Sequence, residues 1–256
     1  MNFQPKLKEV EMKNMVKNIC AAMVISLCAA GHLSATENNP NNDNKFMEEN
    51  LNLIQEWDKT FPQSDKVNHK KITFHNRYGI TLTADLYVPK NATGKLSAIA
   101  ISGPFGAVKE QASGLYAQTL AERGFLTIAF DPSYTGESSG QPRYVASPDI
   151  NTEDFSAAVD YLSTRDDVDA ERIGILGICG WGGMALNAAA IDTRIKATVT
   201  ATMYDMSRVN ANGYFDSMNA DARHELRRQL NAQRTEDYRN GTFALEGGVV
   251  DPLPAD

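Results

Sequence analysis

The sequence predicts an α/β fold: a mostly parallel, doubly wound sheet with an antiparallel hairpin on its N-terminal side. Two observations lead to this prediction. Between residues 96 and 202, short apolar runs alternate with segments of helical period, which is typical of parallel strands joined by helices on both faces of a sheet. Ahead of them, residues 70–88 alternate apolar and polar side chains, which indicates a pair of antiparallel strands with one buried face.

The hairpin comes first in the chain. Ile72 and Phe74 alternate with polar neighbours, and residues 76–79, Asn-Arg-Tyr-Gly, supply the turn. In the returning strand the buried face is expected to carry Ile80, Leu82, Ala84, Leu86 and Val88. The polar face of that strand carries Thr81, Thr83, Asp85 and Tyr87.

Strands and helices then alternate. Apolar strands are expected over residues 96–102, 125–130, 172–177 and 195–202. The helices between them are expected over residues 111–123, about 151–162 and 181–191. Gly124 is expected to terminate the first helix, and Asn151 or Thr152 to cap the second.

Length and composition fit a globular chain with one sizeable core. The chain has 256 residues, of which 42% are hydrophobic and 22% charged. The predicted organisation is a signal peptide over 1–35, a disordered tether and a short helix over 36–66, the core over 67–202, and the start of a cap insertion over 203–256. The formal net charge of -7 gives no field that attracts nucleic acid or an anionic membrane, so neither is expected as a partner.

The N-terminal segment has the layout of a secretory signal peptide. A lysine-rich stretch (Lys6, Lys8, Lys13 and Lys17) precedes an apolar run over 19–30, and small residues follow up to Ala35. Because a bilayer span needs about 20 apolar residues, the run is too short to cross a membrane. This order predicts export to the periplasm or the medium. A buried N-terminal helix is the alternative.

Removal of this segment would leave a single cysteine. Cys20 and Cys28 lie in the apolar run, and Cys179 remains. Cys28 also raises a lipoprotein alternative, which Leu27 disfavours because a small residue is needed there. No intrachain disulfide is therefore expected, and a lone thiol in an oxidising compartment is expected to be buried or used.

The segments on either side of the core differ from it in composition. Residues 36–45 are rich in Asn and predict a disordered tether, and Phe46–Trp57 is expected to form a short helix before Pro62. After the core comes a charged helical segment whose apolar face is made by Ala222, Leu226 and Leu230. We interpret it as the start of a polar cap.

The third parallel strand runs into residues 177–183, Gly-Ile-Cys-Gly-Trp-Gly-Gly, and a helix follows. A strand–turn–helix with a nucleophile at its turn is a nucleophile elbow, whose sharp turn needs small flanking residues; Gly177 and Gly180 meet this need. The helix N-terminus directs N–H groups and partial positive charge at Cys179, which favours a thiolate and a developing oxyanion. We interpret Cys179 as the catalytic nucleophile. A buried, inert core thiol is the alternative.

Further segments accompany the elbow in a set order. They are residues 78–82 (Tyr-Gly-Ile-Thr-Leu) with Val88-Pro89, 103–106 (Gly-Pro-Phe-Gly), Asp131 with 136–140 (Gly-Glu-Ser-Ser-Gly), and Asp169 with 172–174 (Arg-Ile-Gly). Through this order and spacing, the chain from about residue 70 to 202 resembles the α/β-hydrolase family. Its cysteine elbow looks like that of the dienelactone-hydrolase-like branch. The chain departs from the family pattern Gly-x-nucleophile-x-Gly at Trp181, so the close approach of the helix is expected to shift by one residue, to Gly182.

The resemblance implies an oxyanion hole and a reaction. One donor would be the backbone N–H of Gly180, and the second that of Phe105 or Gly106, because Pro104 has no N–H; the alternative is that this loop only ends a strand. Cys179 would attack the carbonyl of a small-molecule acyl substrate and hydrolyse an ester, lactone, thioester or activated amide. No cofactor is expected, and no metal either, since the sequence has no paired His/Cys spacing.

The rest of a catalytic triad is not expected within the chain. The family order is nucleophile, acid, histidine, and His224, the one histidine after Cys179, stands in a charged segment typical of a surface. Asp205 and Asp251 are weak candidates for the acid. The residues interpreted as structural are His69, His75 and Asp131. An acid and a histidine are expected beyond residue 256, in a longer enzyme of which this sequence would be a C-terminally truncated form.

Two hypotheses of other classes stay open. One is a binding protein that keeps the fold without catalysis, which the missing base favours. The other is a thiol redox protein, which would need an external partner because the mature chain has no second cysteine.

The signal-peptide interpretation predicts that the mature chain begins near Thr36, after the small residues that a signal peptidase requires. N-terminal sequencing of protein recovered from the periplasm or the medium should find a first residue near Thr36. Exported protein that still begins at Met1 or Met12 would contradict the interpretation.

Overall fold

The computed structural model describes residue 49 and residues 51–245. All of these belong to one compact unit, Phe46–Asp256. The predicted signal peptide over 1–35 and the Asn-rich segment over 36–45 lie outside the described residues. Among the helices of the described part, none is both long enough and apolar enough to cross a membrane.

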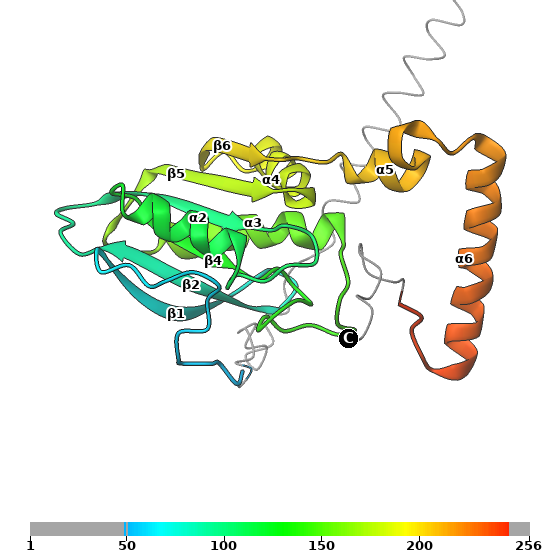
Figure 1. The fold of residues 1–256 in the computed structure, drawn as a ribbon, viewed down its shortest axis with the longest axis horizontal. Helices are drawn as coiled ribbons and strands as arrows, with labels where there is room; N and C mark the ends of the chain where they lie inside the picture. The colour runs from blue at the N-terminus through cyan, green and yellow to red at the C-terminus, as the bar shows by residue number, and fades with distance from the viewer. Residues whose placement is uncertain (1–48, 50, 246–256) are drawn as a thin grey trace, which may run out of the picture. The chain divides into compact units, whose positions relative to one another are not determined.

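The described residues form one six-stranded sheet in the order β1-β2-β4-β3-β5-β6 (Figure 1). The strands are β1 (Val67–His75), β2 (Thr81–Pro89), β3 (Leu96–Ser102), β4 (Leu126–Phe130), β5 (Val168–Ile178) and β6 (Ile195–Ala201). β1 and β2 form the antiparallel hairpin, and β2 also pairs antiparallel with β4. β4, β3, β5 and β6 pair in parallel. The mostly parallel sheet with an N-terminal hairpin is therefore confirmed.

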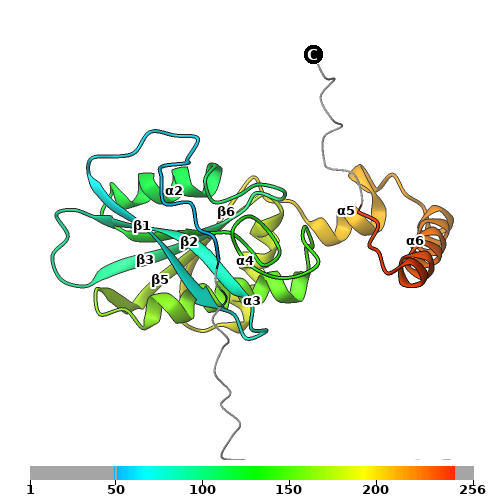
Figure 2. The ribbon, with the colours of Figure 1, turned by 90° about the horizontal axis from the view of Figure 1, so that it is seen from below.

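Helices cover both faces of this sheet, as Figure 2 shows. α2 (Ala112–Ala121) packs on β2, β3 and β4, while α3 (Pro148–Ser163) and α4 (Gly180–Ile191) pack together on the other face. Successive side chains of a strand point to opposite faces, so an interior strand contributes to both cores. In β3, Ala100 packs in the cluster of α3 and α4, and Ile101 packs in that of α2.

The prediction of one buried hairpin face is wrong for β2. Thr83, Asp85 and Tyr87 are as fully buried as the apolar residues that alternate with them. β2 lies between β1 and β4, and the loop after β4 covers its polar face. Ser138 Oγ accepts a hydrogen bond from Thr83 N–H at 2.9 Å, and Thr83 Oγ1–H donates to Glu137 O at 3.1 Å. Polar partners brought by distant loops can bury a polar face, and a period-two pattern does not reveal them.

Residues 51–66, which we call the N-terminal arm, are irregular but packed. The expected helix over Phe46–Trp57 is absent from its described part. Phe61 is buried. Ser64 N–H donates to Gln118 Oε1 of α2 at 3.0 Å, and the Gln118 amide donates back to the arm at Pro62 O. Contacts with α2 therefore override the weak helical preference of the segment.

Buried ion pairs fix this arm and the neighbouring loops on the sheet. The group, which we call the charge network, consists of Asp58, Lys59, Lys71, Asp85, Lys109, Glu110, Asp131 and Glu137. Lys59 Nζ lies 3.0 Å from Asp85 Oδ1, and both side chains are fully buried. Lys71 joins Asp58 of the arm to Glu137 of the loop after β4. Removing one partner of a buried pair typically costs about 3–5 kcal/mol, because it leaves an uncompensated charge.

The start of α3 also differs from the prediction. The helix begins at Pro148, with Ser147 as its N-cap residue, and Pro is favoured at this first position because its φ is already helical. Asn151 lies inside the helix, where its Oδ1 accepts a hydrogen bond from Ser147 N–H at 2.8 Å. The predicted cap at Asn151 or Thr152 is therefore wrong, because the helix begins ahead of both residues.

Three helical elements follow β6. They are α5 (Met206–Asn212), η1 (Tyr214–Asp216) and α6 (Ala220–Asn240), and none of them buries a residue. α6 is the charged helix expected from the sequence, and its apolar residues Leu226 and Leu230 are exposed. That this segment starts a cap stays a prediction.

The charge network predicts a loss of stability in acid. Burial would raise the pKa of Glu137, but hydrogen bonds from Lys109 and Lys71 outweigh it and hold that pKa below the usual 4.5. Because the folded-state pKa lies below the unfolded one, the carboxylate stabilises the fold above about pH 4.5 and this contribution is lost as the pH falls through the lowered pKa. Glu137→Gln should lower the Tm at neutral pH and make the Tm less dependent on pH in acid. Thermal melts across this range measure both effects.

The exposed Glu122→Gln, beyond the end of α2, is the matched control and should leave the acid dependence of the Tm unchanged. Equal acid dependence in wild type and Glu137→Gln would mean that this carboxylate adds nothing to stability.

Candidate active site

Cys179 stands at the junction of β5 and α4, where the chain turns sharply from strand to helix. Its φ of 56° and ψ of -126° lie in a region that residues with a side chain rarely adopt. Cys179 N–H donates to Ala201 O of β6 at 2.9 Å, so the neighbouring strand holds the turn in place. The structure therefore has, at this cysteine, the strained strand-to-helix turn that the sequence predicts.

Glycines let neighbouring atoms approach the main chain closely at this turn. A Cβ on Gly177 would lie 2.3 Å from Trp181 O, and one on Gly182 would lie 2.7 Å from Met203 Cγ. Trp181, at the position where the family pattern has its second glycine, is 3% exposed and packs in the core. The close approach thus occurs at Gly182, one residue later, as the sequence predicts.

The loop after β3 passes directly against the same turn. Gly103 has a φ of 95°, and a Cβ there would lie 2.4 Å from Ile178 O. The ring of Phe105 lies 5.5 Å from that of Trp181, centroid to centroid. Its Cδ2 is 3.5 Å from the position that a Cβ on Gly180 would take. This loop therefore borders the elbow, as the resemblance implies.

Between Pro104 and Lys109, two N–H groups of this loop have no acceptor among the described residues. Pro104 has no N–H, and three others are used: Ala107 N–H by Pro104 O, Val108 N–H by Gln111 Oε1, and Lys109 N–H by Asp131 Oδ1. The N–H groups of Phe105 and Gly106 remain. On the helix side, Gly180 N–H lies in the first turn of α4, where N–H groups lack acceptors within the helix. These three groups are the ones that the sequence names as candidate oxyanion donors.

Residues after β6 add apolar side chains around the cysteine. Met206 Cγ lies 3.0 Å from the Cβ position of Gly180. Tyr204 N–H donates to Cys179 O at 3.4 Å, and its ring meets that of Tyr214 edge-on at 6.5 Å. Sequence reasoning missed these contacts, because the segment after β6 carries no pattern beyond its polar composition.

The described histidines lie elsewhere. His69 lies on β1, and its Nε2 is 2.7 Å from Asp85 Oδ1. Three strands separate β1 from β5 in the sheet. His75 is the last residue of β1, and His224 lies on α6, which buries no residue. Within residues 51–245, no side chain forms a hydrogen bond with Sγ of Cys179, which is half-buried. The described part of the chain therefore supplies no base to this thiol.

The acidic candidates have structural contacts. Asp205 caps α5, where its carboxylate accepts Arg208 N–H at 2.9 Å. Asp131 follows β4 and accepts Glu137 N–H at 3.0 Å, which agrees with its interpretation as a brace for its own loop. Asp251 lies outside the described residues.

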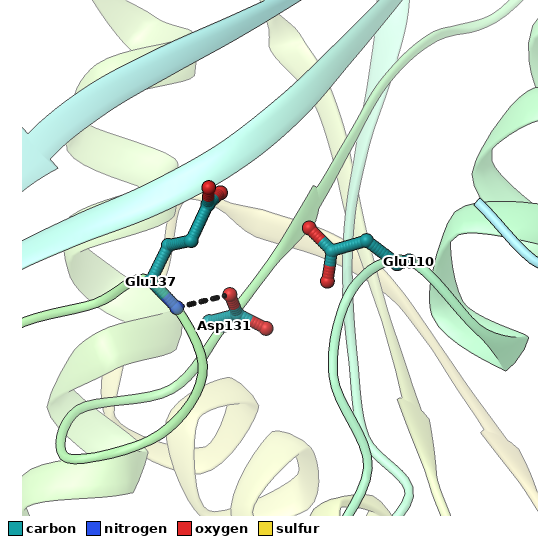
Figure 3. Close-up of side chains that lie close together, drawn as sticks. All are labelled: Glu110, Asp131 and Glu137. Carbon is teal, nitrogen blue, oxygen red and sulfur yellow. Dashed lines mark hydrogen bonds between the residues drawn. The ribbon is translucent and has the colours of Figure 1, made fainter. Parts of the chain in front are cut away.

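Three carboxylates in and beside the loops after β3 and β4 have the spacing of a metal site. Glu110, Asp131 and Glu137 offer oxygens that lie within 4.8 Å of one another (Figure 3). However, Lys109 Nζ already lies 2.5 Å from Glu110, 2.8 Å from Asp131 and 2.6 Å from Glu137. Burial would lower the pKa of Lys109, but the charges of Asp131 and Glu110 outweigh it and hold that pKa above its usual range. The ammonium group of Lys109 thus already pairs with all three carboxylates, and we interpret them as members of the charge network.

Comparison with known proteins gives related sequences along most of the chain. Residues 78–246 match the model of the family described as X-Pro dipeptidyl-peptidase (S15 family). The uncharacterized protein PA2218 of Pseudomonas aeruginosa is 61% identical over 227 residues, which are 88% of this chain and 60% of that protein. The protein YcjY of Escherichia coli is 43% identical over 181 residues, 70% of this chain and 59% of YcjY. The thiohydrolase aneE of Aspergillus aculeatus is 30% identical over 137 residues, 54% of this chain and 42% of aneE.

Solved structures agree with the fold. The crystal structure of PA2218 superposes with a TM-score of 0.76 at 64% identity, over 79% of this chain and 66% of that one. The α/β hydrolase GrgF of Penicillium superposes with a TM-score of 0.52 at 23% identity, over 66% of this chain and 55% of that one. The chain spans about 60% of the length of PA2218 and YcjY. Its fold is that of the α/β hydrolases, and the chain belongs to the family described as X-Pro dipeptidyl-peptidase (S15 family).

Proposed function

We propose that the protein is a hydrolase that cleaves an ester, lactone, thioester or activated amide of a small-molecule acyl substrate, with Cys179 as the nucleophile. One observation carries the proposal. The cysteine occupies the strained turn between β5 and α4, and the unpaired N–H groups of Gly180, Phe105 and Gly106 border this turn. A nucleophile next to such donors is the arrangement that acyl transfer requires.

The reaction begins at Sγ of Cys179. The thiolate attacks the carbonyl carbon, an S–C bond forms, and the carbonyl oxygen takes the negative charge. The N–H of Gly180 and that of Phe105 or Gly106 would stabilise this oxyanion; losing one such donor typically costs about 3 kcal/mol of transition-state stabilisation. Collapse of the intermediate breaks the bond to the alcohol, thiol or amine, which takes a proton from water as it leaves. Water then attacks the acyl thioester, which releases the carboxylic acid and restores the thiol of Cys179.

The described residues support the first half of this reaction. The N-terminus of α4 directs partial positive charge at the carbonyl oxygen that becomes negative when Cys179 attacks. Acylation of Cys179 needs the thiolate and the donors alone, whereas rapid turnover also needs a base.

Two observations favour one type of acyl bond and one type of acyl group for the substrate. The relative aneE is named a thiohydrolase, which favours a thioester among the four classes. The partly exposed side chains of Phe105, Met206 and Tyr204 beside the turn favour an apolar acyl group.

Membership of the dienelactone-hydrolase-like branch is also part of the proposal, supported by a cysteine at the elbow. The signal-peptide pattern over residues 1–35 supports action in the periplasm or the medium.

A binding protein that keeps the fold without catalysis is the second candidate. It is favoured by the finding that, in the part of the chain that the structure describes, no base contacts Cys179. Acylation of the cysteine separates the two candidates, because a binding site has no need of a reactive thiol.

The proposal predicts that activated esters acylate Cys179. Wild-type protein treated with p-nitrophenyl acetate should gain one acyl group in intact-protein mass spectrometry, and faster than N-acetylcysteine does, because N–H donors stabilise the oxyanion. Cys179→Ala should gain none and should change the free energy of unfolding by less than about 1 kcal/mol, since a half-buried sulfur leaves little cavity. Cys179→Ser should react more slowly, using the same donors.

Labelling of the same samples with iodoacetamide is the control for access to the thiol. A thiol that is alkylated but gains no acyl group supports the binding protein. A thiol that reacts with neither reagent is an inert core thiol. Acylation that persists in Cys179→Ala would mean that another residue is the nucleophile.

A further inference from the structure

The loop over residues 103–109 carries the free N–H groups of Phe105 and Gly106 and is attached at both ends. Its first residue, Gly103, packs on the main chain of the elbow, where a Cβ would lie only 2.4 Å from Ile178 O. This contact fixes where the loop starts. It does not fix the direction in which the next residues point, because a second attachment is needed to set the orientation of a flexible segment.

Lys109 provides the second attachment. Its backbone N–H donates to Asp131 Oδ1 at 2.8 Å, and its Nζ donates to Asp131 Oδ2 at 2.8 Å. The side chains of both residues are fully buried. The carboxylate is itself held by further contacts: Oδ2 accepts Glu137 N–H at 3.0 Å, and a Cβ on Gly136 would lie 2.3 Å from it. Main chain and side chain of Lys109 are thus bound by one buried partner, which sets both the position and the orientation of the end of the loop.

We propose that Lys109 and Asp131 are a positioning pair, which holds the N–H of Phe105 or Gly106 where the oxyanion forms. The inference rests on the proposed function and adds to it two residues that touch no substrate. Donors stabilise a developing charge best when they are already in place. A displacement of about 1 Å can lower a rate by about 100-fold.

A purely structural role is the competing explanation, and the charge network offers a matched control. Lys59 and Asp85 are also fully buried and lie 3.0 Å apart. Lys59 belongs to the N-terminal arm and Asp85 to β2, so neither is part of the loop. Breaking either pair leaves a buried charge without a partner and should lower the Tm. Of these two pairs, only that of Lys109 and Asp131 is attached to the loop over 103–109.

Two reactions of the same sulfur separate positioning from folding. Acylation by p-nitrophenyl acetate passes through an oxyanion and uses the N–H donors. Alkylation by iodoacetamide displaces iodide at a saturated carbon and forms no oxyanion. A change in the access or ionisation of Cys179 alters both rate constants, while a displaced donor alters only the first. The ratio of acylation to alkylation is therefore the quantity to measure.

The test uses the full chain and the folded fraction from size-exclusion chromatography. In Asp131→Asn, which keeps the side-chain shape, and in Lys109→Met, the ratio should fall about 10- to 100-fold; in the controls Lys59→Met and Asp85→Asn it should stay within about twofold of wild type. Lys109→Arg keeps the positive charge and should recover part of the ratio.

An unchanged ratio in the loop variants, or an equal fall in the controls, would overturn the positioning role while the proposed function stands. Wild-type protein that is alkylated but acylated no faster than N-acetylcysteine would overturn the proposed function itself. If Asp131→Asn and Lys109→Met are both insoluble, Asp131→Glu replaces them. It keeps the charge but moves the carboxylate by one methylene relative to Lys109, and an unchanged ratio there also overturns the role.

Discussion

The fold closes around the turn at Cys179 because three glycines let neighbouring atoms approach there. Gly103, Gly177 and Gly182 each stand where an added Cβ would come within 2.7 Å of a neighbouring atom. At Gly103 and Gly177 that atom is a main-chain oxygen, so a methyl group would push the loop after β3, or α4, away from β5; at Gly182 it is the side chain of Met203. The separation between the turn and the loop after β3 therefore depends on close main-chain contacts that only glycine permits.

The charge network acts on the same loop from the other end. Its lysines, Lys59, Lys71 and Lys109, each contact at least two carboxylates. These contacts join the N-terminal arm, β2 and the loops after β3 and β4, which no regular hydrogen-bond ladder connects. Buried pairs of this kind add little net stability compared with apolar residues. We interpret their role as geometric, because other arrangements of these loops would leave a buried charge unpaired.

The features that the sequence predicted depend on residues close together in the chain, whereas the features that it missed depend on residues far apart. The hairpin, the parallel strands and the elbow at Cys179 follow from patterns within a few residues, such as period two or glycines around a cysteine. The second buried face of β2 and the packing of the N-terminal arm depend on partners far along the chain. Lys109 is the clearest case. A lone lysine in a loop carries no local signal, and its burial is decided by Asp131 and Glu137, which come from another loop.

The backbone at Cys179 also limits how this position can evolve. A residue with a side chain at a φ of 56° stores about 1–3 kcal/mol of strain, which glycine would avoid. A glycine here would make the fold more stable and remove the sulfur, so selection for stability and selection for chemistry oppose each other at this position. Branching at Cβ is tolerated worst in this conformation. Threonine is thereby excluded as a replacement nucleophile, and serine is the hydroxyl residue that this turn can accept.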